Sequence, residues 1–240
     1  MQAYHPIEGA RSDVFVFADH ASRHVPDWVG ALGVSAPDMR RHIAYDIGSE
    51  WVARRLCAQL DCAGLLCGFS RLVIDANRDL AAPGLIPDTS DGTTIPANQN
   101  LSLPQREERI QRLYTAYHDA LGRDLDARPG ALAISVHSFT PQIVGEPPRD
   151  TDIGLLVKDD SETAVAFKTE LIRTAPDLQI DINLPYSAHD LNFTVDNSVV
   201  TRGHPHLAIE LRQDHIDTLT GAHVMADRVA RAVNAILQET

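Results

Sequence analysis

The feature of this chain that most limits its fold is the alternation of short apolar runs with longer stretches of helical periodicity. The apolar runs predict buried strands at residues 14–18, 65–75, 131–136, 153–157 and 206–211. The stretches between them predict helices at residues 46–60, 104–126, 161–174 and 219–237. Strands that alternate with helices indicate an α/β fold with a mainly parallel or mixed sheet.

Length and charge narrow the class of protein further. The 240 residues fit one domain spanning residues 1–240, and no apolar stretch is long enough to cross a membrane. A net charge of -12 argues against a nucleic-acid partner, because phosphate binding relies on dense lysine and arginine. The first ten residues lack the layout of a signal peptide, and the three cysteines cannot all pair with one another. We therefore expect a cytoplasmic globular protein whose Cys57, Cys62 and Cys67 fill the core, metal ligation being the alternative.

Polar groups able to do chemistry lie where the main apolar runs end. They are His20, Asn77 with Arg78, His137 with Ser138, and Glu210 with Arg212. In open α/β sheets, ligands bind in the crevice outside the carboxyl ends of the strands. The sequence therefore predicts that these groups converge on one site.

Two histidines are the candidate metal ligands. His20 and His137 each follow a buried strand, where neutral imidazole nitrogens could bind zinc or another divalent ion. A catalytic zinc normally takes three protein ligands. We expect Asp46, at the start of a predicted helix, to be the third, with His24 and Asp19 as the alternatives. The purely structural interpretation is that these histidines are buried with all their hydrogen bonds made, or that they lie on the surface.

Glu210 and two arginines complete the candidate chemistry. Glu210 is flanked by apolar residues, which predicts a general base, or else a salt bridge to Arg212 or Arg71. Arg71 and Arg78 flank a short predicted strand. One guanidinium could bind a substrate carboxylate, and the other could stabilise a developing oxyanion. The alternative for both arginines is that they are surface groups or ion-pairing groups.

Three further segments have two interpretations each. Tyr117 and His118 fit packed helix positions, or groups that support the site from behind. Residues 183–186, which end in Tyr186, fit a plain turn or a specificity loop. The long irregular segment 80–103 is typical of a functional lid or of disorder.

Seven short motifs resemble the N-formylglutamate amidohydrolase family. They run from the first predicted strand to the last, so the resemblance covers nearly the whole chain. Singly none is specific, but together they are. The matching stretches are residues 19–22, 42–48, 70–78, 95–98, 135–141, 183–186 and 209–214.

The resemblance implies a three-layer α/β/α fold like that of zinc carboxypeptidases, the phosphorylase/hydrolase-like architecture. It also implies hydrolysis of N-formyl-L-glutamate to formate and L-glutamate. By more distant similarity to the aspartoacylases, Asn77 and Arg78 would hold a substrate carboxylate and Arg71 would polarise the scissile carbonyl. His20 and His137 would hold zinc, and Glu210 would be the base. We place Ser138, Tyr186 and Arg212 among the substrate-binding residues.

This chain departs from the family pattern at two points. Arg23 stands where the carboxypeptidase-like pattern has a glutamate three residues after the first histidine, so Asp46 is inferred rather than matched. Residues 145–152 lack the expected Arg-Pro-Trp, which affects the pocket wall.

These observations predict a zinc-dependent amidohydrolase that acts on a small N-acyl acidic amino acid, with N-formyl-L-glutamate first. One alternative is a zinc deacylase or carboxypeptidase-like hydrolase with another substrate. The other is a non-catalytic protein that binds acidic metabolites on the same scaffold. No oligomeric state follows from the sequence.

Overall fold

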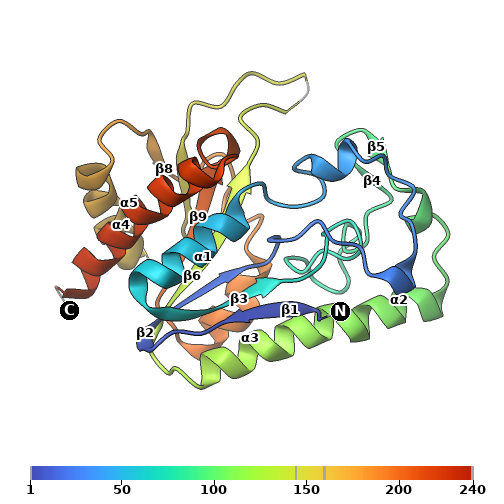
Figure 1. Cartoon of the computed structure of the whole chain (residues 1–240), viewed down its shortest axis with the longest axis horizontal. Helices are drawn as coiled ribbons and strands as arrows, with labels where there is room; N and C mark the ends of the chain where they lie inside the picture. Colours follow the sequence, from blue (N-terminus) through green and yellow to red (C-terminus); the bar gives the residue numbers. More distant parts are fainter. Residues whose placement is uncertain (1, 144, 159–160, 239–240) are drawn as a thin grey trace.

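The computed structural model describes residues 2–143, 145–158 and 161–238. Its centre is a seven-stranded sheet of order β1-β3-β2-β6-β9-β7-β8 (Figure 1). Strands β3, β2, β6 and β9 run parallel, while β1 and β7 are antiparallel to their neighbours β3 and β9. The sheet is therefore mixed and mostly parallel, as predicted. The strands are β1 (Tyr4–Ile7), β2 (Arg11–Ala18), β3 (Cys62–Cys67), β6 (Leu132–Phe139), β7 (Ile153–Leu156), β8 (Ile180–Ile182) and β9 (His206–Arg212).

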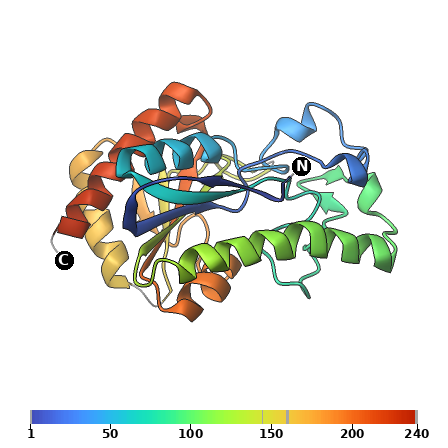
Figure 2. The same ribbon diagram turned by 60° about the horizontal axis from the view of Figure 1, so that its bottom comes forward.

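Helices cover both faces of the sheet, which makes the three layers visible in Figure 2. On one side lie α1 (Ser49–Leu60), α4 (Ser161–Thr174) and α5 (Leu219–Gln238). On the other side a long helical run comprises α2 (Leu103–Arg109), the π-helix η4 (Ile110–Thr115) and α3 (Ala116–Asp126). A second π-helix, η5 (Val195–Val199), packs beside α3. The remaining turns of 3₁₀-helix are η1 (Asp27–Val29), η2 (Asp38–Arg40), η3 (Pro96–Asn98), η6 (Val200–Arg202) and η7 (Gln213–His215).

Strand β2 shows why the central strands read as continuous apolar runs. Val14 and Val16 pack into the core beneath α1 and α5, whereas Phe15 and Phe17 pack into the core beneath α3. Because successive side chains of a strand point to opposite faces, a strand covered on both sides must be apolar throughout. The three cysteines are buried and unpaired, as expected for core residues.

The predicted strand at residues 65–75 is wrong in its second half. Strand β3 ends at Cys67, and the chain then continues through turns, with the Ser70 amide donating to His24 and the Asp75 amide to Leu85. Leu72, Val73 and Ile74 are fully buried in these turns, so their apolar character reflects burial and not strand pairing. The edge strands β1 and β8 were not predicted. His137 and Glu210 lie within β6 and β9, near the strand ends.

The segment at residues 80–103 is largely irregular, as expected, but it is tied to the body of the protein. It contains a two-stranded hairpin, β4 (Thr89–Ser90) and β5 (Thr93–Thr94), closed by an Asp-Gly turn. Buried Asn98 donates from Nδ2 to the carbonyls of Leu72 and Pro87 and accepts from Arg109. The segment therefore forms a fixed wall next to the turns that follow β3.

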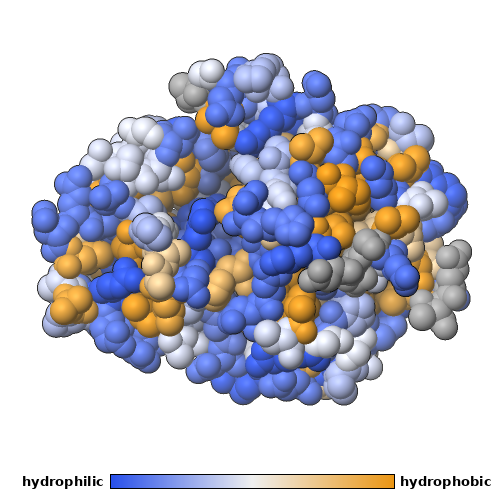
Figure 3. All heavy atoms as spheres, turned by 180° about the vertical axis from the view of Figure 1, so that it is seen from behind, coloured by the Kyte–Doolittle hydropathy of each residue, from blue (hydrophilic) through white to orange (hydrophobic). Residues whose placement is uncertain are grey.

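In the part of the chain that the structure describes, no helix is long and apolar enough to cross a membrane. The face opposite to that of Figure 1 is mainly hydrophilic, with apolar residues in small scattered groups (Figure 3). Such scattered apolar groups are normal for a protein surface.

Candidate active site

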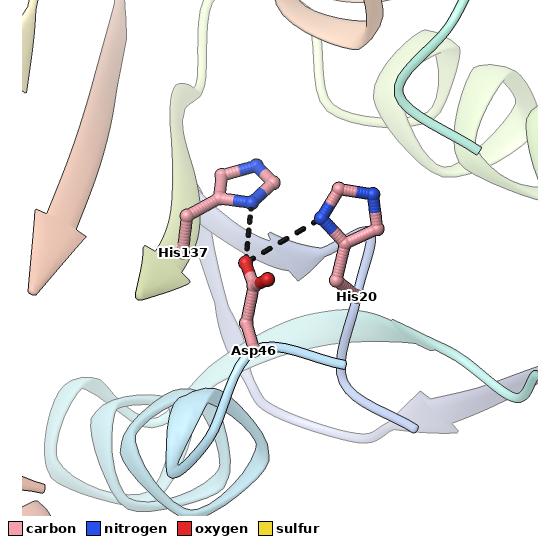
Figure 4. A group of neighbouring side chains, drawn as sticks. All are labelled: His20, Asp46 and His137. Atoms are coloured by element: carbon pink, nitrogen blue, oxygen red, sulfur yellow. Dashed lines mark hydrogen bonds and ion pairs between the residues drawn. The ribbon is translucent and has the colours of Figure 1, made fainter. Parts of the chain in front are cut away.

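The structure brings His20, Asp46 and His137 together (Figure 4). His20 lies two residues after the end of β2, His137 lies in β6, and Asp46 lies three residues before α1. Asp46 Oδ2 is 2.9 Å from His137 Nδ1 and 3.4 Å from His20 Nδ1, and the two rings are 5.2 Å apart. All three side chains are buried, and one potential ligand atom from each lies within 4.8 Å of the others.

The loop that carries Asp46 is fixed on several sides. The Asp46 amide donates to the His20 carbonyl, and the Ser49 hydroxyl donates to the Asp46 carbonyl. The Ser138 hydroxyl donates to the Ile47 carbonyl, and the Ser138 amide donates to Asp46 Oδ2. Gly48 has a φ of 82°, and a Cβ atom there would lie 2.2 Å from the Ile216 carbonyl oxygen. The turn therefore requires glycine at position 48.

The chemistry of this group fits a divalent metal ion. Two imidazoles and a carboxylate are ligands that zinc and several similar ions accept. His20 Nδ1 is buried without a hydrogen-bond partner among the described residues, as expected of an atom whose partner is an ion. Neither alternative third ligand faces the atoms that His20, Asp46 and His137 share. His24 is exposed. Asp19 lies on the other side of the His137 ring, with Oδ2 3.6 Å from Nε2, whereas Asp46 contacts Nδ1 of that ring.

Further carboxylates engage the far side of each imidazole. Asp75 Oδ1 is 2.7 Å from His20 Nε2, and Asp75 Oδ2 accepts from Arg71. Buried Tyr117 donates its hydroxyl to Asp19 Oδ1 at 2.7 Å, and Asp19 in turn faces His137. A carboxylate behind a metal-binding histidine fixes the tautomer and the orientation of the ring. Asp75 was not predicted as a site residue, because it stands at the end of the predicted strand at residues 65–75.

The acidic groups of the site have opposite pKa shifts. Burial acts to raise the pKa of Asp46 and of Asp75, but the charges of His20 and, for Asp75, Arg71 hold both pKa values well below their usual range. Burial raises the pKa of Glu210 to about 7, against the opposing charge of His137. Glu210 is thus poised to exchange a proton near neutral pH.

Glu210 stands next to His137 in the sheet, because β6 and β9 pair these two residues in register. Its Oε2 atom is buried without a hydrogen-bond partner among the described residues. Glu210 does not form the alternative that was predicted, a salt bridge to Arg212 or Arg71. Arg212 pairs with Asp152 and Asp214, while Arg71 pairs with Asp46 and Asp75.

A cavity of about 270 Å³ joins these groups to the other candidates. It is lined by nine of the ten predicted site residues, namely His20, Asp46, Arg71, Asn77, Arg78, His137, Ser138, Tyr186 and Glu210. The exception is Arg212, whose Nη1 atom donates to the carbonyls of residues 149–151 and so braces a loop. Four polar residues that also line the cavity were not predicted from the sequence, namely His42, Ser135, Thr140 and Asn192.

The chain is similar in sequence and in fold to known proteins. The family model described as FGase, N-formylglutamate amidohydrolase, matches residues 12–216. The chain is similar to the gene product Atu2144 from Agrobacterium tumefaciens, with 28% identity, a TM-score of 0.89 and coverage of 99% of this chain and 97% of that one. It has the fold of an N-formylglutamate amidohydrolase from Ralstonia eutropha, with 17% identity, a TM-score of 0.77 and full coverage of both chains. No curated protein matches the chain significantly in sequence.

Proposed function

The chain belongs to the N-formylglutamate amidohydrolase family, and from that premise we propose that it is a metal-dependent enzyme that hydrolyses N-formyl-L-glutamate to formate and L-glutamate. Family membership makes it an amide-hydrolysing enzyme that acts on a small molecule. The metal and the acidic N-acyl substrate are our proposal. The observation that carries the proposal is one cavity lined by the His20, Asp46 and His137 group, by Glu210, and by Asn77 with Arg78.

His20, Asp46 and His137 would hold zinc or another divalent ion. When bound, such an ion supplies Lewis acidity, which polarises a carbonyl and lowers the pKa of water. Glu210 takes a proton from the attacking water and returns it to the leaving amine. Its raised pKa suits both transfers near neutral pH.

Arg71 and Arg78 have separate roles in this mechanism. Arg71 lines the cavity and has more N–H donors than its bonds to Asp46 and Asp75 use, so it can stabilise the developing oxyanion. Arg78 and Asn77 bind a carboxylate of the substrate, while Ser138 and Tyr186 line the same cavity and contact the rest of the molecule.

The activity test is release of L-glutamate from N-formyl-L-glutamate by zinc-loaded protein, compared with a panel of other N-acyl amino acids. We expect acidic substrates to react fastest. Equal rates on neutral N-acyl amino acids would favour a deacylase of another specificity. A metal-loaded protein that binds acidic amino acids and hydrolyses none of the panel would refute the proposal and favour a binding protein.

Arg78→Ala should raise KM for N-formyl-L-glutamate by roughly 10- to 100-fold, because a hydrogen bond to a charged group is lost. The kcat should change little, since this contact is present in both the ground state and the transition state. Steady-state kinetics measures both values. Arg54→Ala is the matched control, because Arg54 pairs with Glu50 on the surface of α1. A fall in kcat at unchanged KM would contradict the role given to Arg78.

Asp75→Asn should weaken zinc binding by roughly 10- to 100-fold, because Asp75 orients the His20 ring through Nε2. Competition with a chromophoric chelator measures the affinity. Asp124→Asn removes a surface carboxylate that pairs with Arg128 on α3 and should leave it unchanged. Equal affinities in the two variants would show that Asp75 does not orient the ligand.

A further inference from the structure

The residues that would bind the substrate carboxylate, Asn77 and Arg78, lie in a turn that is held almost entirely through its main chain. The Ala76 carbonyl lies 2.9 Å from His118 Nε2 and accepts from the Thr194 hydroxyl at 3.3 Å. The Arg78 carbonyl accepts from the Tyr114 hydroxyl at 2.8 Å. These bonds use no side-chain atom of residues 77 and 78, and both side chains line the cavity; the Arg78 guanidinium also lies near Asp75, with Nε 3.9 Å from Oδ2.

The groups that hold the turn come from the two π-helical regions. Tyr114 lies in η4, His118 lies one turn further along in α3, and Thr194 immediately precedes η5. The ring centres of Tyr114 and His118 are 4.3 Å apart, with the ring planes tilted by 49°, and Phe193 contacts both rings. Short π-helical segments occur frequently at functional sites. Here the two segments converge on one three-residue turn.

The protonation of these groups matches their bonds. A carbonyl oxygen can only accept, so His118 must carry its proton on Nε2. Burial lowers the pKa of His118, which keeps the ring neutral, and burial raises the pKa of Tyr114, which keeps the phenol protonated. Both side chains are therefore donors throughout the neutral pH range.

The Asn77 amide is oriented by the same arrangement. Its Oδ1 atom accepts from the Thr194 main-chain amide at 2.9 Å, so the Nδ2 amino group is the end left for a ligand. An arginine also offers only donors. Asn77 and Arg78 together therefore suit a group that only accepts, as a carboxylate does, and they disfavour a carboxamide, whose amino group would meet donors.

We propose that Tyr114 and His118 are positioning residues which, by holding the carbonyls of Ala76 and Arg78, keep Asn77 and Arg78 in place as a donor-only site for a substrate carboxylate. The inference rests on the proposed function and adds the groups that give the site its preference for carboxylate over carboxamide.

The test compares Tyr114→Phe, His118→Phe and the double variant with the wild type, each loaded with zinc. The substrates are N-formyl-L-glutamate and its two amides, in which either the side-chain or the α-carboxylate has become a carboxamide. Each single variant should raise KM for N-formyl-L-glutamate about fivefold, and the double variant should raise it further, with kcat nearly unchanged. The preference for N-formyl-L-glutamate is its kcat/KM divided by that of the more slowly hydrolysed amide. This ratio should fall by similar factors.

Two controls separate positioning from general damage. His118→Gln retains a donor near the place of Nε2 and should restore most of the wild-type KM. Tyr4→Phe removes a hydroxyl from edge strand β1 and should behave like the wild type. All variants should bind zinc in the wild-type ratio.

The outcomes are distinct. If the wild type hydrolyses none of these substrates, the proposed function fails, and this inference with it. If the wild type is active and prefers the carboxylate but the variants keep that preference, only the positioning role fails. Equal losses on N-formyl-L-glutamate and on both amides would indicate a structural role for Tyr114 and His118, and would also overturn the inference.

Discussion

Glu210→Gln lowers kcat for N-formyl-L-glutamate by about 10²- to 10⁴-fold, the usual contribution of a general base, and leaves the bound metal in place. The amide has nearly the shape of the carboxyl group but cannot accept the proton of the attacking water. Metal should be retained, because the carboxylate that lies against both imidazoles is Asp46, whereas Glu210 adjoins His137 in the next strand. Steady-state kinetics together with metal analysis of the same preparation checks both halves of the expectation.

The pH profile supplies a second measurement of this variant. Burial raises the pKa of Glu210 to about 7, and a base works only when it has lost its proton. The rate of the wild type should therefore rise with pH through the neutral range, and this rise should vanish in Glu210→Gln. Glu108→Gln is the matched control, because Glu108 pairs with Arg112 on the surface of α2. Near-normal turnover by Glu210→Gln would remove the glutamate from the mechanism.

Asp46→Asn should abolish stoichiometric metal binding, with an affinity loss greater than the roughly 10- to 100-fold typical of groups that only support a ligand. Asp46 Oδ2 lies against both His20 and His137, and the substitution takes away the negative charge that would balance a cation there. Mass spectrometry of the purified variant measures the metal content, and activity should fall with it.

The same measurement decides between the candidate third ligands. His24→Ala should keep the full metal content, because His24 is exposed and lies outside the buried group. If Asp46→Asn retained its metal and His24→Ala lost it, the ligand set would have to be redrawn. A variant that unfolds is recognised by circular dichroism and is replaced by Asp46→Glu, which should bind metal more weakly but stay folded.

Much of the site could be anticipated because parallel strands bring their carboxyl ends to one edge of the sheet. His20 and His137 are far apart in sequence, yet both were expected there, and nine of the ten predicted residues line one cavity. Arg212 does not line this cavity, because a strand end says where a side chain starts but not which acceptors lie nearby. Asp152 and three main-chain carbonyls bind it instead.

Other features depend on contacts that have no local pattern. Asp75 and Thr194 act through partners from distant parts of the chain, and no spacing indicates such pairs. The turns after β3 read as a strand because a buried turn and a buried strand are equally apolar. The short edge strands β1 and β8 have mixed polarity, since solvent reaches part of each.

His137 and Glu210 lie in interior strands of the sheet, and His20 follows a third, since β6, β9 and β2 each have a strand on either side. Edge strands and chain ends open first in native-state fluctuations, whereas central strands commonly exchange their amide protons only when the whole molecule unfolds. We therefore expect His137 and Glu210 to lie on the slowest-exchanging part of the fold. Fraying of β1 or β8 should leave them undisturbed, so heat inactivation should coincide with cooperative melting and not precede it.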